Sequence, residues 1–214
     1  GSVDTLISPS KLRIMPYHDP TKEHRGLAVF EQAIPEHNYV ITVDVSRGVG
    51  SDYSAFTVMD TTTIPYKMVA RYKNNEIKPI VLPNIITDVA RNYNQAYILC
   101  EVNDIGGQVA DIIQYDLEYE NLLMCSMRGR AGQQLGQGFS GKKTQLGIKM
   151  STAAKQVGCS NLKALIEDDK LLINDYDTIA ELTTFIAKGQ TFQAEEGCND
   201  DLAMCLVIFA WMAM

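Results

Sequence analysis

The chain has 214 residues, of which 46% are hydrophobic and 21% charged, and its formal net charge is −7. This composition is typical of a globular protein with a substantial core, and no apolar run reaches the roughly 18–20 residues needed to cross a membrane. All three histidines lie before residue 38, which excludes a Ser-His-Asp triad or a Cys-His pair within the main body. The five cysteines lack metal-binding spacing and predict reduced thiols in a cytosolic compartment.

Residues 3–38 are predicted to form an N-terminal appendage or linker with two short strands, and Gly1-Ser2 has the form of a cloning scar. Three β-rich segments follow and predict an antiparallel meander: 39–45, 53–60 and 66–73. The next expected elements are a helix within 78–94, a buried strand over 96–102, a helix over 104–118 and a strand over 121–127.

A glycine-rich loop is expected over 128–142, and a helix over 143–158 with Gly158 as a possible stop. Short helices and strands follow, and a strongly apolar helix begins at Asp200 or Asp201. The order β-β-β-α-β-α-β predicts an α/β fold over residues 39–214. Its mixed central sheet has three antiparallel strands, then parallel strands, with helices on both faces.

Carboxylates stand where predicted strands and helices end. Asp44 lies in the apolar strand "VITVDV" and Glu101 at the end of "AYILCEV", where a lone buried charge costs several kcal/mol. Asp200 and Asp201 begin the last helix, where they have an alternative role as caps. Oxygen ligands without histidine or cysteine suit Mg²⁺ or Mn²⁺. Two such ions about 3.5–4 Å apart would cleave a phosphodiester.

Basic residues are segregated within 121–166, a stretch with no acidic residue: Arg128, Arg130, Lys142, Lys143, Lys149, Lys155 and Lys163. Such a segment favours a nucleic-acid partner, with a random cluster of solvated lysines as the alternative. Its loop "GQGFSGKKT" resembles a P-loop, but Lys143 stands where Ser or Thr would bind Mg²⁺. No ATP site is therefore expected, and we interpret the loop as gripping DNA phosphates through Arg128, Arg130, Lys142, Lys143 and Lys149.

Four segments together resemble the ribonuclease H-like nuclease domain of tailed-phage terminase large subunits, in particular the large myovirus type. They are "YVITVDVSRGVGSDYSAFTVMD", "ILCEVNDIGGQVADII", "SMRGRAG…GFSGKKTQLG" and "EEGCNDDLAMCLVIFAW". The resemblance implies catalytic, metal-binding roles for Asp44, Glu101 and Asp201, with Asp200 close by or bridging, and an auxiliary metal role for Asp52.

The resemblance also implies an activity: metal-dependent cutting of concatemeric viral DNA, with little sequence specificity, in the host cytoplasm. The implied partners are double-stranded DNA, an ATPase domain, a portal ring and the small terminase subunit. Three alternatives remain at this stage. They are an actin-like phosphotransferase, a Holliday-junction resolvase or transposase core, and a non-catalytic module that docks on DNA or the portal.

Overall fold

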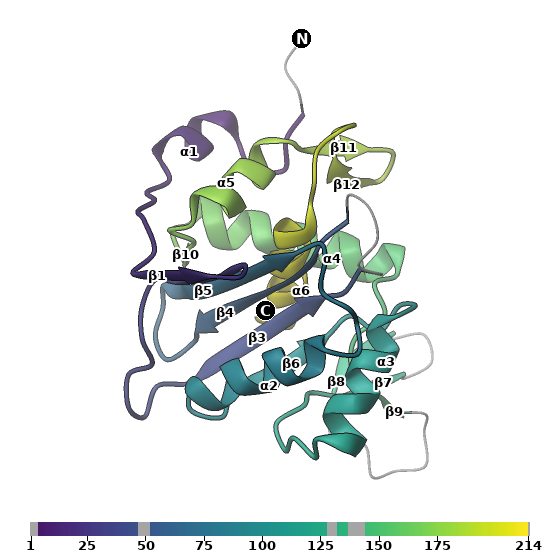
Figure 1. Cartoon of the computed structure of the whole chain (residues 1–214). Coiled ribbons are helices and arrows are strands. Elements are labelled where there is room, and N and C mark those ends of the chain that lie inside the picture. Colours follow the sequence, from purple (N-terminus) through teal and green to yellow (C-terminus); the bar gives the residue numbers. More distant parts are fainter. Residues whose placement is uncertain (1–3, 47–51, 128–131, 137–143, 214) are drawn as a thin grey trace.

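The computed structural model describes residues 4–46, 52–127, 132–136 and 144–213. A seven-stranded sheet at its centre has the order β1-β2-β5-β4-β3-β6, with β10 paired to β5 (Figure 1). The bounds of its strands are β1 (Lys22–His24), β2 (Leu27–Val29), β3 (Tyr39–Asp44), β4 (Ser54–Asp60), β5 (Tyr66–Asn74), β6 (Tyr97–Cys100) and β10 (Leu171–Leu172).

The neighbours β3, β4 and β5 are antiparallel, and β6 runs parallel to β3. The predicted meander and the mixed sheet are therefore confirmed. The helices are α1 (Pro9–Ile14), α2 (Leu82–Asn92), α3 (Gly106–Asp111) continued by a π-helix η1 (Ile112–Asp116), α4 (Thr152–Glu167), α5 (Tyr176–Thr183) and α6 (Asp201–Ala213).

The two faces of the sheet carry different helices, and the alternation along β3 shows how. Ile41 and Val43 belong to the core cluster that also contains the buried side of α2. Thr42 points to the opposite face, where its hydroxyl donates to the carbonyl of Cys205 in α6 at 2.8 Å. Because side chains alternate along a strand, Asp44 lies on the same face as Thr42 and α6. This register directs Asp44 toward the start of that helix.

Helix α6 is the centre of the second layer, with every side chain from Asp201 to Ala210 buried. It lies behind the sheet with α4 beside it (Figure 1). The two helices approach closely at Gly158, where an added Cβ would lie 2.6 Å from the carbonyl oxygen of Val207. Gly158 therefore serves close packing in mid-helix, and its predicted role as a helix stop is wrong.

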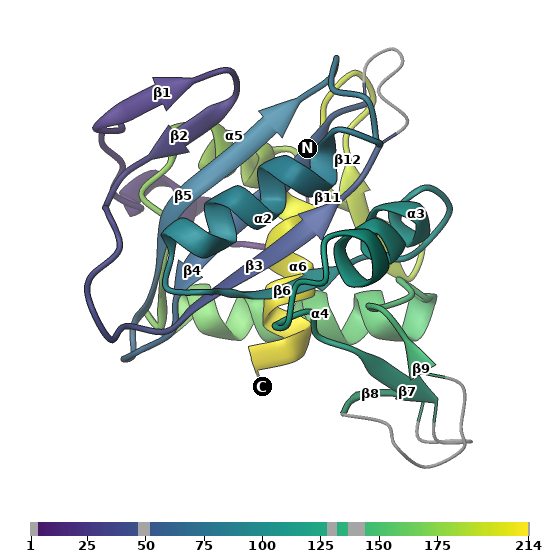
Figure 2. The ribbon, with the colours of Figure 1, turned by 60° about the horizontal axis from the view of Figure 1, so that its bottom comes forward.

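Smaller sheets lie outside the central one. Strands β7 (Cys125–Met127), β8 (Gln133–Leu135) and β9 (Thr144–Gln145) form one that projects from the body (Figure 2). Strands β11 (Phe185–Lys188) and β12 (Thr191–Ala194) form a hairpin. The helix predicted from residue 143 instead begins at Thr152, where the Ser151 hydroxyl accepts the N–H of Ala154. The start of the range predicted as this helix is strand β9.

The segment predicted as an N-terminal appendage is packed against the rest of the chain. Strand β2 pairs with β5 in the central sheet, and residues predicted as a strand near Lys11 form α1 instead. The N–H of Ser8 donates to Glu167 at the end of α4 at 3.1 Å. Within the described residues, no helix has the length and apolar character of a membrane span.

Candidate active site

Two carboxylates lie side by side because β3 and β6 are parallel neighbours. Val43 is opposite Cys100, and the N–H of Glu101 donates to the carbonyl of Val43 at 3.0 Å. Asp44 and Glu101 therefore stand at the carboxyl ends of adjacent strands, as predicted. Gly106, at the start of α3, fits against this edge because a Cβ there would overlap the carbonyl oxygen of Glu101.

The side chains of Asp44 and Glu101 are hydrogen-bonded to each other. Two carboxyl groups can share such a bond only when one carries a proton. Burial raises the pKa of Asp44 well above its usual value, and the charge of Glu101 raises it further. Burial also raises the pKa of Glu101, although the nearby Lys155 partly offsets this. Both shifts favour a shared proton in the metal-free pair, and a bound cation would favour its release.

Asp201 is the third carboxylate, at the N-terminus of α6 and only 8% exposed. It accepts hydrogen bonds from the main-chain N–H groups of Tyr53 and of Asp201 itself. Its Oδ2 atom, however, is buried without a hydrogen-bond partner among the described residues. Burial raises the pKa of Asp201 to about 6, although Lys73 lowers it in part. One buried oxygen is thus left for a ligand.

Asp200 and Asp201, which the sequence did not separate, differ in their contacts. Asp200 Oδ2 accepts the N–H of Ala194 at 3.0 Å, and its carbonyl accepts that of Met204 at 2.7 Å. Asp200 thus helps to begin α6. Asp52, the predicted auxiliary ligand, is exposed.

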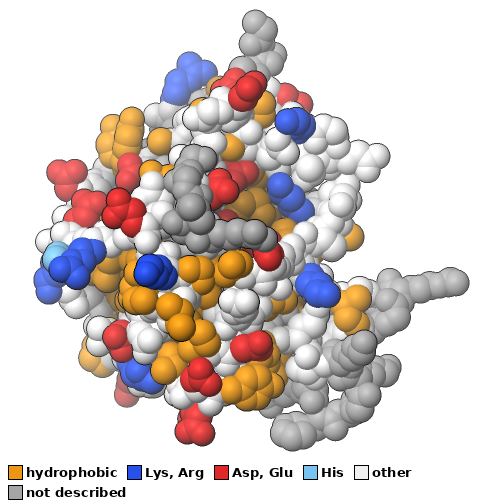
Figure 3. Space-filling model, turned by 45° about the vertical axis from the view of Figure 1, so that its right-hand side comes forward, with side chains coloured by type: hydrophobic (Ala, Val, Ile, Leu, Met, Phe, Trp, Pro, Cys, Tyr) orange, Lys and Arg blue, Asp and Glu red, His pale blue; other side chains and the backbone are white. Residues whose placement is uncertain are grey.

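A cavity of about 430 Å³ lies beside Asp44 and Asp201, and Glu101 is not among its lining residues. Its lining includes Asp44, Asp52, Asp104, Asp200 and Asp201. Figure 3 shows acidic side chains at the centre of this face, beside a hollow partly floored by hydrophobic groups, with basic side chains to their right.

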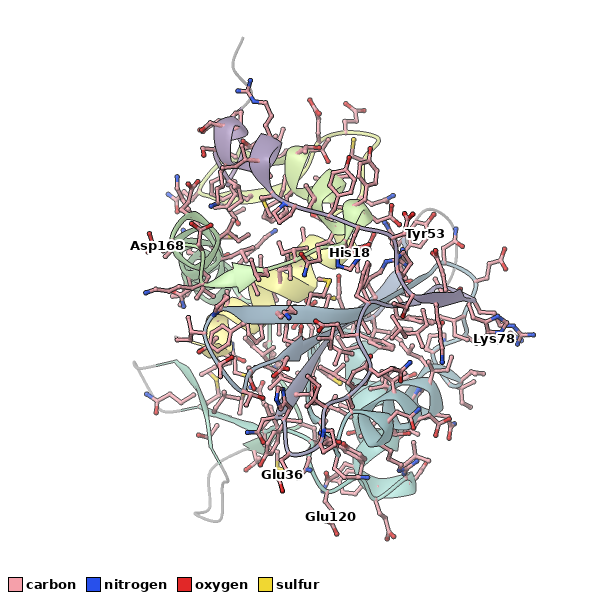
Figure 4. The ribbon with its side chains drawn as sticks, turned by 90° about the vertical axis from the view of Figure 1, so that its left-hand side faces the viewer. His18, Glu36, Tyr53, Lys78, Glu120 and Asp168 are labelled. Atoms are coloured by element: carbon pink, nitrogen blue, oxygen red, sulfur yellow. The ribbon has the colours of Figure 1, made fainter. Side chains whose placement is uncertain are left out.

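The site is confined to one end of the sheet. Tyr53, just before β4, and Glu36, just before β3, lie at opposite ends of β3 (Figure 4).

The donor set fits a hard divalent cation, because it consists of carboxylate oxygens and includes the orphaned Oδ2 of Asp201. As the side chains stand, no three His, Cys, Asp or Glu residues in the described ranges are spaced to hold a metal ion. Asp44 and Glu101 are bonded to each other instead. A cation bound by both carboxyl groups would take the place of the proton between them.

Of the five basic residues predicted to contact DNA, one lies within the described residues. Lys149 is exposed between β9 and α4, and its N–H donates to the Gln133 side chain at 2.6 Å. Four others lie outside the described residues: Arg128, Arg130, Lys142 and Lys143.

The structure adds residues that sequence reasoning did not assign to the site. Asp104, at the start of the helix predicted over 104–118, lines the cavity, and the charge of Lys155 in α4 lowers the pKa of Glu101. Glu181 of α5 contacts the start of α6, and Lys73 of β5 pairs with it. The sequence does indicate that Glu181 needs a partner, because this acid lies in the apolar segment "TIAEL". No sequence pattern identifies Lys73 as that partner, because the two residues are far apart in the chain.

The fold and the site define a class. A mixed sheet with carboxylates at the ends of adjacent parallel strands, faced by the N-terminus of a packed helix, is ribonuclease H-like, the fold of terminase nucleases. A family model described as the terminase RNaseH-like domain matches residues 41–210. The chain belongs to this family.

Solved structures share the architecture at low sequence identity. The large terminase nuclease of thermophilic phage G20c with bound magnesium matches with a TM-score of 0.71 and 20% identity, over 99% of this chain and 98% of that one. The large terminase nuclease domain of Thermus phage P74-26 gives 0.63 and 21%, over 93% and 91%. The human cytomegalovirus terminase nuclease domain gives 0.52 and 10%, over 95% and 93%.

Proposed function

We propose that this chain is a metal-dependent endodeoxyribonuclease that cuts concatemeric viral DNA, with little sequence preference, during genome packaging. One observation carries the proposal: Asp44, Glu101 and Asp201 converge at one end of the sheet, and the buried Oδ2 of Asp201 lacks a partner among the described residues. The family supports it, as do the phage G20c nuclease structures with bound magnesium, cobalt and zinc.

We assign Asp44, Glu101 and Asp201 as the direct ligands of one or two Mg²⁺ or Mn²⁺ ions, with Asp200 and Asp52 beside them. Bound ions of this kind activate a water and stabilise the leaving oxygen of a phosphodiester. The carboxyl groups of Asp44 and Glu101 would hold the ion in their deprotonated form and would give up the proton between them to the solvent. Two main-chain N–H groups hold Asp201 and leave Oδ2 for the ion. No histidine is needed for this chemistry.

Double-stranded DNA is the proposed substrate. Lys149 is exposed and basic, and each lysine or arginine that neutralises a phosphate contributes roughly −0.9 to the slope of log K against log salt. Backbone contacts alone carry no base information, which fits weak sequence preference. The further partners we propose are an ATPase domain, a portal ring and the small terminase subunit, all in the host cytoplasm.

Plasmid nicking tests the proposal. We expect supercoiled DNA to be nicked and linearised by the wild-type chain with Mn²⁺, and to survive with EDTA or with Asp44→Asn. Asp88→Asn is the matched control, because the Asp88 side chain is exposed on the outer side of α2. Among the described residues it pairs only with Arg91. Full cleavage by Asp44→Asn would remove the site assignment.

The substrate distinguishes the proposal from its alternatives. A terminase-type nuclease should cut linear duplex at least as well as a four-way junction, whereas a resolvase should prefer the junction. A chain that binds DNA but cuts neither substrate, with Mg²⁺ or Mn²⁺, would be a docking module. That outcome would overturn the proposed activity.

A further inference from the structure

Helix α6 is capped by a side chain from a different helix. The Glu181 carboxylate, on α5, accepts the N–H groups of Leu202 at 2.8 Å and Ala203 at 3.1 Å through Oε1. The first N–H groups of a helix have no partner within the helix, so this oxygen satisfies two of them. Glu181 is only 6% exposed and therefore fixes the turn of α6 that carries Asp201.

A lysine completes this contact. Lys73 Nζ of β5 lies 2.6 Å from Oε2 of Glu181 and 4.5 Å from the centre of the Tyr53 ring. The main-chain N–H of Tyr53 in turn donates to the Asp201 carboxylate. Lys73 thus connects the two supports of Asp201, the capped helix turn and the segment before β4.

The cap of α6 is a charged carboxylate, that of Glu181, and it lies near the charge of Asp201. Neutral Ser or Asn side chains cap helices adequately. A carboxylate beside Asp201 repels it unless a cation compensates, and Lys73 supplies that cation. The pair therefore does more than end a helix, because it holds Asp201 from two sides without adding net charge.

We propose that Glu181 and Lys73, here called the Glu181–Lys73 clamp, are positioning residues that hold Asp201 with Oδ2 facing the cavity, ready for a divalent cation. This inference rests on the proposed metal site. Neither residue is a proposed ligand. Residues that orient metal ligands typically contribute 10- to 100-fold to metal affinity, so substitution of either clamp residue should weaken metal binding.

Calorimetric titration with Mn²⁺ tests the clamp without DNA. We expect Lys73→Met and Glu181→Ala to weaken Mn²⁺ binding about 10- to 100-fold. The matched control is Lys67→Met, on the same strand, because Lys67 pairs with Glu31 at 3.2 Å. This variant should bind Mn²⁺ as the wild type does. Asp44→Asn should bind none at this site.

A second readout uses metal-free protein. Amide hydrogen exchange at Leu202 and Ala203 should accelerate in Glu181→Ala and remain slow in Glu181→Gln, which keeps an acceptor oxygen. If Glu181→Ala does not fold, Lys73→Met and Glu181→Gln provide the test.

The outcomes separate the two claims. Absence of Mn²⁺ binding by the wild type overturns the metal site and the clamp together. If Asp44→Asn loses binding while Lys73→Met and Glu181→Ala keep wild-type affinity, only the clamp is overturned. The clamp would also be contradicted if Lys67→Met weakened Mn²⁺ binding as much as Lys73→Met does.

Discussion

Two clusters of buried charge lie on this sheet, and they are built in opposite ways. In the first, Arg71 of β5 lies among three acids, at 2.9 Å from Asp177, 3.3 Å from Asp175 and 3.3 Å from Glu23. In the second, Asp44, Glu101 and Asp201 converge, and no described lysine or arginine forms an ion pair with them. The acids of the first cluster pair directly with their cation, whereas Lys73 and Lys155 act on Asp201 and Glu101 without a direct ion pair.

The difference extends to single atoms. In the Arg71 cluster, Asp175 Oδ2 also accepts the N–H of Thr178 at 3.1 Å and its hydroxyl at 2.6 Å, capping α5. In the site, Asp201 Oδ2 accepts nothing within the described ranges. Buried charge alone therefore does not mark a functional site. A buried acid without a direct ion pair and with an unused oxygen does, because only a ligand can complete it.

The largest expected effect separates the two adjacent aspartates. Asp201→Asn should reduce Mn²⁺-dependent nicking by more than about 100-fold, because it removes a direct ligand. Asp200→Asn should cost about tenfold, because Oδ2 of Asp200 already serves the main chain of Ala194. Initial nicking rates at saturating Mn²⁺ measure both. The reverse order would assign the ligand to Asp200.

The next effect breaks the Arg71 cluster. Arg71→Met should lower the free energy of unfolding by about 3–5 kcal/mol, because it leaves the buried Asp175 carboxylate without its cation. Urea denaturation measures this loss. Mn²⁺ affinity should stay at the wild-type level, since Arg71 contacts no proposed ligand. A large change in affinity without a change in stability would contradict the division between the clusters.

pH should affect the second cluster, that of the site, in a defined direction. The folded state raises the pKa of Asp201 to about 6, and that of Asp44 also lies well above its usual value, in both cases mainly through burial. Raised acid pKa values mean that metal-free protein loses stability as pH rises from about 4 through these values. Cations bind the deprotonated groups, so the Mn²⁺-induced rise in melting temperature should grow between about pH 5 and pH 8. A rise independent of pH would refute this.

The smallest expected effect is on the stability contributed by the partly exposed pair of His37 and Asp60, which lies outside both clusters. Burial raises the pKa of Asp60, but hydrogen bonds from Thr62 and His37 outweigh it and lower the pKa overall. Its stabilisation is therefore present above about pH 4 and is lost as pH falls through the folded pKa. Asp60→Asn should cost about 1 kcal/mol at pH 7 and less in acid. Melting curves at both pH values measure the difference.

The sequence predicted the carboxylates of the site better than their supports. Asp44 and Glu101 were identifiable because a carboxylate in an apolar strand requires a partner, and each lies near the end of such a strand. Asp200 and Asp201 were indistinguishable, because both precede the same helix and only burial separates them. The pairing of Lys73 with Glu181 links residues 108 positions apart and leaves no local pattern.

The errors in the predicted fold have the same origin. Gly158 has the sequence signature of a helix end, yet contact with Val207 of α6 makes it a mid-helix packing residue. A short strand that contains β2 was predicted, but its pairing with β5 in the central sheet joins distant segments, and local propensity does not reveal it. Periodicity predicted the central strands correctly because each carries its own apolar pattern.

Anomalous diffraction from crystals soaked in Mn²⁺ tests the central claim most directly. We expect one or two manganese peaks with oxygens of Asp44, Glu101 and Asp201 at about 2 Å, and Oδ2 of Asp201 among the ligands. Manganese bound elsewhere, with the hydrogen bond between Asp44 and Glu101 intact, would contradict it.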